Sequence, residues 1–463
     1  MSQATDPVIT DPAALFDAAT RSLEADGHAF GPHAGPAPRV ADARRRRLRD
    51  GAPADAAAYL TLVRGADGLL DFRFDAGPAM RPQRRAARRG AAGLFDAVPI
   101  NHTLFKPVDG SQVSAFLAGL DQGFNPRYGL FDLQGRRVDH IVPAGRVLLI
   151  VHGTFSHSGA IVDQLAQARG AAGAATGRQL LQAAQAHYQQ VLVFEHPTLQ
   201  VGPWINALDL ARAFAGTQAA VDVVCHSRGG LVTRWWLEVL QRDLQARSRV
   251  VFVASPLMGT GLASPYRLRA ALKLLANYAA AVGTVSGLAG LAVPMFKVVE
   301  GLAALLASGT GLLARTPVAD ATIAMVPGLA AMSRYGPDGG DFIRGNVELE
   351  KLAFGHAAAP PGYFAVTSDF ESAAAGWQFW QAFRRPVERV ADAGADMLFS
   401  GANDLVVDTA SMTQVGGDAH IVDPPLPAEP RRRLDFGTND RVHHLNYFLQ
   451  PETVAFIRRA LGF

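Results

Sequence analysis

The chain has 463 residues and 49% of them are hydrophobic, which allows about two or three domains, or one domain with large insertions. Its formal net charge of +3 is nearly balanced and does not favour a nucleic-acid partner, and its single cysteine, Cys225, excludes an intramolecular disulfide and any multi-cysteine metal site. Residues 1–20 contain neither the basic nor the apolar segment of a signal peptide, so we expect a cytoplasmic protein.

The first segment, residues 1–140, is rich in Arg, Pro and Ala and has weak periodicity. Two short apolar runs, residues 59–63 and 69–74, predict strands. Two arginine-rich runs, residues 44–47 and 84–89, predict a solvated face or a flexible arm. We interpret residues 1–140 as an N-terminal extension, to which the sequence assigns no role.

The second segment, residues 141–463, contains short apolar runs that predict buried parallel strands. The first run, residues 146–151, ends at a His-Gly pair. The other runs leave room for a helix between successive strands and lie at residues 191–194, 221–225, 249–253 and 363–366. Residues 179–187 and 231–244 have helical patterns in two of these intervals. Strands that alternate with helices predict an α/β domain with a mostly parallel sheet.

An insertion rich in Leu, Ala and Gly, residues 256–345, separates two of the predicted strands. Leu268 and Leu272 begin an apolar stripe along one face of a predicted helix. Residues 277–296 carry no charge and are long enough to span a bilayer, but their content of Ala, Gly, Val and Ser favours lid helices. We therefore predict an apolar lid that makes transient contact with a membrane surface.

The strongest signal for chemistry lies at the end of the predicted strand 221–225, where His-Ser-Arg-Gly-Gly leads into a helical stretch. This is the context of a nucleophile elbow, a sharp turn that exposes a serine hydroxyl between a strand and a helix. The residues two before and two after the serine must be small, because strand and helix pass close together there. Cys225 and Gly229 meet this requirement. We therefore predict that Ser227 is a nucleophile.

A serine nucleophile needs a base, and the base needs an acid that orients it. Both should follow the serine along the chain, in the order Asp or Glu and then His. Asp404 follows the apolar residues 397–399, which we predict as a strand, and His444 precedes a helical stretch at residues 451–461. We predict Asp404 as the acid and His444 as the base.

Asp408 and His443 are the alternatives for the acid and the base, and two backbone N–H groups are candidates for an oxyanion hole. Asp408 follows a further apolar run that should carry it away from the site, and we predict a structural role for it. Adjacent histidines on a turn point in different directions, so we do not expect His443 to reach the serine. The N–H groups of Thr154 and Arg228 are our candidates for an oxyanion hole.

These segments resemble the α/β-hydrolase lipases and esterases, particularly bacterial lipases with a His-Gly oxyanion loop. They also resemble the wider group of lecithin–cholesterol acyltransferase-like and GPI-inositol-deacylase-like enzymes. The matching segments are residues 151–154 (Val-His-Gly-Thr), 226–230 (His-Ser-Arg-Gly-Gly), 255–256 (Ser-Pro), 259–260 (Gly-Thr), 403–407 (Asn-Asp-Leu-Val-Val) and 444–448 (His-Leu-Asn-Tyr-Phe). The resemblance implies an α/β-hydrolase fold, with a mostly parallel central sheet flanked by helices, a Ser-Asp-His triad and no cofactor. It covers about residues 145–260 and 345–463, and it places a lid at the insertion.

We therefore predict a serine ester hydrolase, a lipase or carboxylesterase, that acts on an apolar ester or lipid through an acyl-enzyme. An acyltransferase or amidase with the same triad is one alternative. A membrane- or partner-binding protein built on a hydrolase scaffold is another. The chain has no Walker A motif and no His-Glu-x-x-His motif, so we expect no nucleotide cofactor and no metal.

Overall fold

The computed structural model describes residues 10–28, 30–32, 58–75, 97–105, 108, 112–170, 176–264, 267–285, 288–309, 326–334, 346–353, 358–374, 376–383, 398–399, 401–424 and 431–463. Both predicted arginine-rich runs, 44–47 and 84–89, lie outside these residues. The chain forms two compact units, each built from segments that are distant in sequence. The first unit comprises Met1–Gly123, Leu268–Met325 and Ala375–Gln381, and the second comprises Phe124–Arg267, Val326–Ala374 and Ala382–Phe463.

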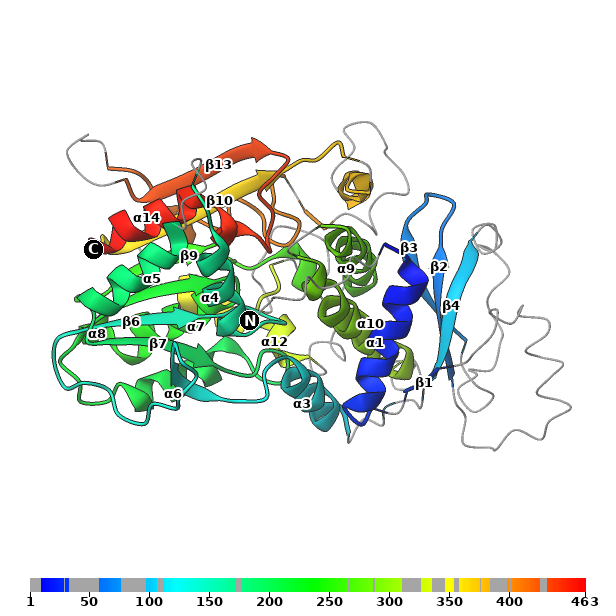
Figure 1. Ribbon diagram of the computed structural model, residues 1–463, viewed down its shortest axis with the longest axis horizontal. Helices are drawn as coiled ribbons and strands as arrows, with labels where there is room; N and C mark the ends of the chain where they lie inside the picture. Colours follow the sequence, from blue (N-terminus) through cyan, green and yellow to red (C-terminus); the bar gives the residue numbers. More distant parts are fainter. Residues whose placement is uncertain are drawn as a thin grey trace, which may run out of the picture. The chain divides into compact units, whose positions relative to one another are not determined.

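A seven-stranded sheet is the centre of the second unit (Figure 1). Its strands are β5 (Gly129–Asp132), β6 (Arg146–Val151), β7 (Gln190–Glu195), β8 (Ala220–His226), β9 (Arg249–Val253), β10 (Tyr363–Phe370) and β13 (Arg433–Asn439). Their order is β13-β10-β9-β8-β6-β7-β5, and only β5 runs antiparallel to its neighbour. This order, with helices between the parallel strands, is that of the α/β-hydrolase fold, as predicted.

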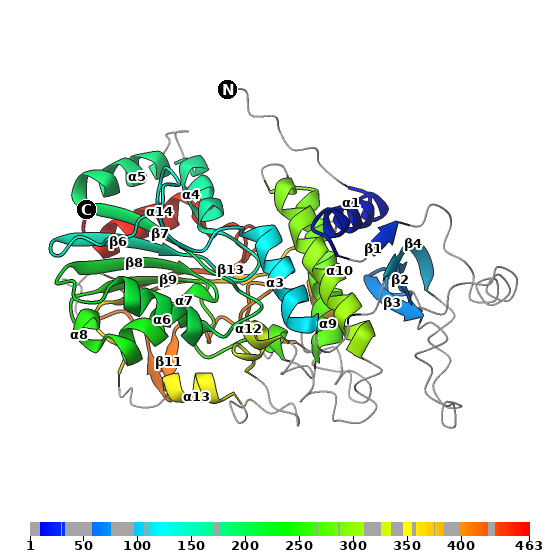
Figure 2. The same ribbon diagram turned by 90° about the horizontal axis from the view of Figure 1, so that it is seen from below.

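Helices cover both faces of this sheet (Figure 2). One face carries α4 (Ser158–Gln167), α5 (Thr176–His187) and α14 (Pro451–Leu461), and the other carries α6 (Pro203–Ala213) and α7 (Gly229–Arg234). Alternate side chains of the inner strands enter the two cores, so Leu148 and Ile150 of β6 lie in one and Val147 and Leu149 in the other. Burial on both faces is the physical reason why these strands read as continuous apolar runs.

The chain changes the direction of winding between β6 and β8. From β6 it passes through α4 and α5 to β7 on one side, and then crosses through α6 to β8 on the other side of β6. Ligands of open α/β sheets bind beyond the carboxyl ends of the strands at such a switch point. Ser227 directly follows β8 and Thr154 follows β6, so the topology brings these two predicted residues to one edge.

The predicted helix at residues 231–244 is divided. It consists of α7, the π-helix η4 (Trp235–Leu240) and α8 (Arg242–Gln245). The remaining described elements of this unit are η5 (Gly261–Ala263), α12 (Pro327–Ala330), α13 (Val347–Ala353), β11 (Gln414–Gly416), β12 (Ala419–His420) and η10 (Tyr447–Leu449).

The first unit contains an antiparallel sheet of four strands in the order β1-β4-β2-β3. The strands are β1 (Phe30–Pro32), β2 (Ala58–Arg64), β3 (Leu70–Asp75) and β4 (Val98–Phe105), and the helices are α1 (Pro12–Ala25), α3 (Val113–Phe124), α9 (Leu268–Gly283), η7 (Ala289–Leu291), α10 (Ala292–Gly309) and η9 (Gln378–Phe383). Phe16 of α1, Phe72 of β3 and Phe296 of α10 form a cluster with ring centroids 5.7–6.4 Å apart.

Two predicted boundaries change as a result. The cluster around Phe16 and Phe296 gives the N-terminal segment and the insertion a common core, so α9 and α10 are packed helices of a separate unit. Strand β5 belongs to the main sheet, and the unit that contains this sheet begins at residue 124, whereas the predicted domain begins at residue 141. The sequence missed β5 because a four-residue edge strand has too few apolar residues to stand out.

One helical stretch among the described residues, Ala289–Leu306, is long and apolar enough to cross a membrane. However, 72% of it is buried inside the protein, and the core helix of a soluble protein passes the same test. It also contains Lys297, which pairs with Asp26, and Glu300, which accepts a hydrogen bond from Thr20. The uncharged residues 277–296 are divided between the end of α9 and the start of α10, so they do not form one continuous helix.

Candidate active site

Ser227 occupies a strained turn between β8 and α7. Its φ of 52° lies in the left-handed region, which residues other than glycine rarely adopt. The N–H of Ser227 donates to the carbonyl of Val253 at 3.0 Å, and its own carbonyl accepts from Gly230 at 2.9 Å. The turn is therefore held by hydrogen bonds from both sides.

Small residues flank this turn, as the elbow requires. A Cβ on Gly229 would lie 2.6 Å from the carbonyl oxygen of Val151 and 2.7 Å from that of His152, which is closer than atoms can approach. Cys225 is fully buried, and its Sγ lies 3.6 Å from the carbonyl oxygen of Val251. Burial raises the pKa of this thiol to about 12, so Cys225 is an inert packing residue at the position where glycine is more common.

The residues with strained backbone conformations lie at one edge of the sheet, beyond the carboxyl ends of its strands. Among the described residues, the non-glycine positions with positive φ are Phe155 (56°), Ser227 (52°), Ala254 (50°) and Leu405 (82°). The first three follow the carboxyl ends of β6, β8 and β9, and the fourth is next to Asp404. Such strain persists only where the surrounding structure enforces it, and it is concentrated at functional sites.

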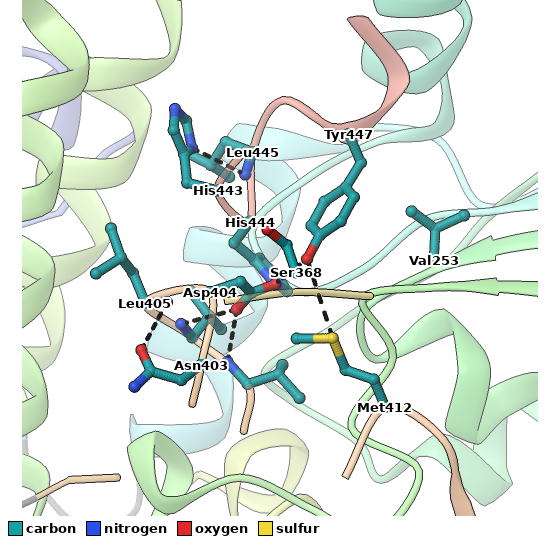
Figure 3. A network of polar contacts seen from close by, with 12 residues as sticks. Val253, Ser368, Asn403, Asp404, Leu405, Met412, His443, His444, Leu445 and Tyr447 are labelled. Atoms are coloured by element: carbon teal, nitrogen blue, oxygen red, sulfur yellow. Dashed lines mark hydrogen bonds and ion pairs between the residues drawn. The ribbon is translucent and has the colours of Figure 1, made fainter. Parts of the chain in front are cut away.

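The structure brings the predicted acid and base together. The Nδ1 atom of His444 lies 2.8 Å from Oδ2 of Asp404, and the main-chain N–H of His444 donates to the carbonyl of Asp404 at 3.1 Å (Figure 3). Oδ1 of Asp404 accepts from the N–H groups of Val406 at 3.1 Å and Val407 at 2.8 Å. A carboxylate can only accept, so Nδ1 of His444 is the donor in the hydrogen bond to Asp404.

The competing residues have other surroundings. Asp408 forms an isolated antiparallel bridge with Asn403, and its carbonyl accepts from the N–H of Ser411 at 2.9 Å. His443 packs edge-to-face against Phe370, with ring centroids 5.5 Å apart. Burial, together with the nearby charge of His444, lowers the pKa of His443 to about 3. His443 is therefore neutral at physiological pH.

The end of β10 holds together the loop that carries Asp404 and the loop that carries His444. Oδ1 of Asp369 accepts from the N–H of Asn403 at 3.1 Å, and the hydroxyl of Ser368 donates to the carbonyl of Val442 at 2.9 Å. The strand predicted at residues 397–399 is not observed at residues 398–399, which have no strand partner, and residue 397 lies outside the described residues. The loop that carries Asp404 is instead anchored to β10 by the hydrogen bond between Asn403 and Asp369.

Ser227 and His444 lie on neighbouring loops. His226, which precedes the serine, donates from Nε2 to the carbonyl of His444 at 3.0 Å, and the two imidazole centroids are 4.8 Å apart. Within the described residues, no hydrogen bond joins the hydroxyl of Ser227 to the ring of His444. Such bonds are often long in the absence of substrate and tighten when it binds.

The His-Gly loop after β6 lies directly against the serine. A Cβ on Gly153 would be 2.6 Å from Cβ and 3.2 Å from Oγ of Ser227. The carbonyl of Gly153 accepts from Nδ1 of His152 at 2.8 Å, and the N–H of Phe155 donates to Thr198 at 3.4 Å. The N–H of Thr154 belongs to the same trans peptide as the Gly153 carbonyl and points in the opposite direction, away from His152.

A buried polar cluster supports this loop, and the sequence did not reveal it. Glu195, at the end of β7, accepts from the N–H of Ser158 at 3.1 Å and from Asn125 at 2.7 Å. His152 stacks on His196 with ring centroids 4.0 Å apart, and its Nε2 lies 3.4 Å from Glu195. Burial lowers the pKa of His152 to about 3, so the ring is neutral. The only signal for Glu195 was its place at the end of a predicted strand.

The sheet order, the turn at Ser227 and the joined Asp404 and His444 define a protein of the α/β-hydrolase fold. Residues 127–462 match the family model described as a domain of unknown function (DUF7379), and the chain belongs to this family. A comparison with curated proteins finds no match. Among the described residues, no group of three or more His, Cys, Asp or Glu side chains could hold a metal ion.

Several solved structures are similar to this chain at low sequence identity. Lipase BlEst2 from Bacillus licheniformis is 15% identical, and the match covers 73% of this chain and 98% of that chain with a TM-score of 0.34. Lipase 1 from Pelosinus fermentans is 13% identical over 68% of this chain and 98% of that chain, with a TM-score of 0.38. Phospholipase PlaB from Legionella pneumophila is 12% identical over 68% of this chain and 60% of that chain, with a TM-score of 0.35.

Proposed function

We propose that the protein is a serine hydrolase that cleaves carboxylic esters through an acyl-enzyme. Ser227 is the nucleophile, His444 the base and Asp404 the acid that orients the base. The observation that carries the proposal is the hydrogen bond of 2.8 Å between Asp404 and His444, at the same sheet edge as the strained serine. A binding protein without activity would have no need for this pair beside a strained nucleophile.

In the first step, Oγ of Ser227 attacks the carbonyl carbon of the ester while Nε2 of His444 takes the hydroxyl proton. Asp404 keeps the imidazole in the correct tautomer and stabilises the imidazolium that forms. The negative charge that develops on the carbonyl oxygen is stabilised by the N–H groups of Thr154 and Arg228.

The tetrahedral intermediate then collapses to an acyl-enzyme on Ser227. His444 gives its proton to the departing alcohol. A water molecule, activated by the same imidazole, attacks the acyl carbonyl, and the second intermediate releases the acid and restores the serine.

The substrate that we propose is an apolar ester or lipid, as predicted from the composition of the insertion, which is rich in Leu and Ala. We also propose transient contact with a membrane surface and a cytoplasmic location. An acyltransferase or amidase would use the same residues and differ only in the acceptor or in the leaving group.

Labelling with a fluorophosphonate probe, which reacts with activated serines, tests the proposal. The wild type should be labelled, Ser227→Ala should not, and the control Ser248→Ala should be labelled like the wild type. Ser248 is a buried serine whose hydroxyl donates to the carbonyl of Leu244, so it matches Ser227 in burial but lies outside the proposed site. Equal labelling of the wild type and Ser227→Ala would refute the nucleophile.

The wild type and Ser248→Ala should hydrolyse p-nitrophenyl esters, tested over increasing acyl length, and Ser227→Ala should not. Loss of a triad nucleophile typically lowers the rate by about a millionfold. Product analysis with added alcohols and amines separates hydrolysis from acyl transfer, since a transferase would form new esters or amides in preference to the free acid.

A further inference from the structure

The phenol of Tyr447 contacts the proposed acid directly. Tyr447 begins η10, on the loop that follows His444, and its side chain is fully buried. Its hydroxyl donates to Oδ2 of Asp404 at 3.1 Å, the same oxygen that accepts from Nδ1 of His444 at 2.8 Å (Figure 3). One carboxylate oxygen is therefore shared between the base and the phenol.

With these hydrogen bonds, every acceptor position of the Asp404 carboxylate is used. Oδ1 accepts from the N–H groups of Val406 and Val407, and Oδ2 accepts from His444 and Tyr447. Two oxygens offer about four acceptor positions, and all four are used. The carboxylate cannot rotate without losing a hydrogen bond in a fully buried site, where such losses are severe.

The ring of Tyr447 is held independently of its hydroxyl. It packs edge-to-face against Phe436, with centroids 6.2 Å apart, and it belongs to the buried core on one face of the main sheet. Replacing Tyr447 by phenylalanine therefore removes the hydrogen bond while leaving the aromatic packing in place.

We propose that Tyr447 is a positioning residue that acts through Asp404, an inference that rests on the proposed function. Its hydroxyl keeps Oδ2 facing His444 and withdraws negative charge from the oxygen that stabilises the imidazolium. Without this donor, the carboxylate interacts more strongly with the imidazolium but is less well oriented. The phenol thus sets how well the carboxylate orients His444 and, through it, the rate of the reaction.

The chain offers a matched control in Tyr188. Its hydroxyl donates to Oδ2 of the buried Asp222 at 2.7 Å, near the amino ends of the strands and away from Ser227. Tyr447→Phe and Tyr188→Phe therefore each remove one buried hydrogen bond from a tyrosine to an aspartate. Only the first should alter catalysis.

For Tyr447→Phe we expect kcat to fall about three- to thirtyfold with KM within about twofold of wild type. The acidic limb of the kcat/KM profile should move to higher pH by about half a unit. Tyr188→Phe should leave both unchanged, although each variant should lose some stability to urea. A Tyr447→Phe profile that coincides with that of Tyr188→Phe would overturn the proposal.

A second measurement does not depend on any ester. The proton between His444 and Asp404 should give a low-field signal in the proton NMR spectrum, identified by its loss in Asp404→Asn. Tyr447→Phe should shift this signal and Tyr188→Phe should not, so the contact is tested even if Ser227→Ala proves fully active and the proposed function fails. An unchanged signal in Tyr447→Phe refutes the inference.

If Tyr447→Phe does not fold, Tyr447→3-fluorotyrosine decides the question. This replacement keeps the ring and makes the phenol a stronger donor. The acidic limb should then move to lower pH, in the opposite direction from the phenylalanine variant. A limb that stays in place overturns the proposal.

Discussion

A single methyl group at Gly153 should disable the site. The backbone of Gly153 is not in the left-handed region, so alanine can adopt its conformation. However, the new Cβ would lie 2.6 Å from Cβ of Ser227, whereas carbon atoms in contact stay about 3.5 Å apart. Either the loop after β6 or the nucleophile must therefore move by about 1 Å.

A displacement of about 1 Å at a reacting centre lowers the rate by about a hundredfold, or about 2.7 kcal/mol of transition-state stabilisation. The added volume should also reduce the free energy of unfolding by about 1–3 kcal/mol. We expect Gly153→Ala to remain folded and to have a kcat/KM about a hundredfold below wild type, measured with p-nitrophenyl butyrate and by urea denaturation.

Gly401→Ala is the matched control, because a Cβ at this exposed loop position meets no atom within 4 Å. It should keep the activity and stability of the wild type. If Gly153→Ala hydrolyses the ester within threefold of the wild-type rate, the loop after β6 does not face the reacting atoms.

Three further predictions concern individual side chains. Asp404→Asn should lower kcat by about a thousandfold or more, since it destroys the acceptor for Nδ1 of His444, whereas Asp408→Asn should retain most activity; a larger loss at Asp408 would reverse the assignment. His444→Ala should be as inactive as a nucleophile variant, and His443→Ala should keep a substantial fraction of kcat, so the opposite order of activities would contradict the assignment. Burial raises the pKa of Glu348 to about 7, so between about pH 4.5 and pH 7 the native state retains a proton that the unfolded chain releases. The free energy of unfolding therefore falls as pH rises through this range. Glu348→Gln should match wild type at pH 4 and exceed its free energy of unfolding by about 1–3 kcal/mol at pH 8, and equal stability at pH 8 would show that this carboxyl is not buried as described.

The central strands were predictable because of where they lie. The runs at residues 146–151, 221–225 and 249–253 correspond to β6, β8 and β9, which are covered by helices on both faces and are therefore continuously apolar. Strand β13 is an edge strand with an alternating sequence and no fully buried residue, and it carries no such signal. Composition reports burial, so this strand, which has no fully buried residue, escaped the prediction.

The sequence by itself determined the turn at Ser227, because the requirement for small residues on both sides of an elbow is local. It also predicted Asp404 and His444, but it could not establish that they meet, since 40 residues separate them. Only the tertiary structure decided that contact, through the hydrogen bonds by which the end of β10 holds both loops. The hydrogen bond from the hydroxyl of Tyr447 to Asp404 depends on the same two loops meeting at the end of β10. A hydrogen bond between distant segments is set by the packing of the whole sheet, and no pattern in either segment encodes it.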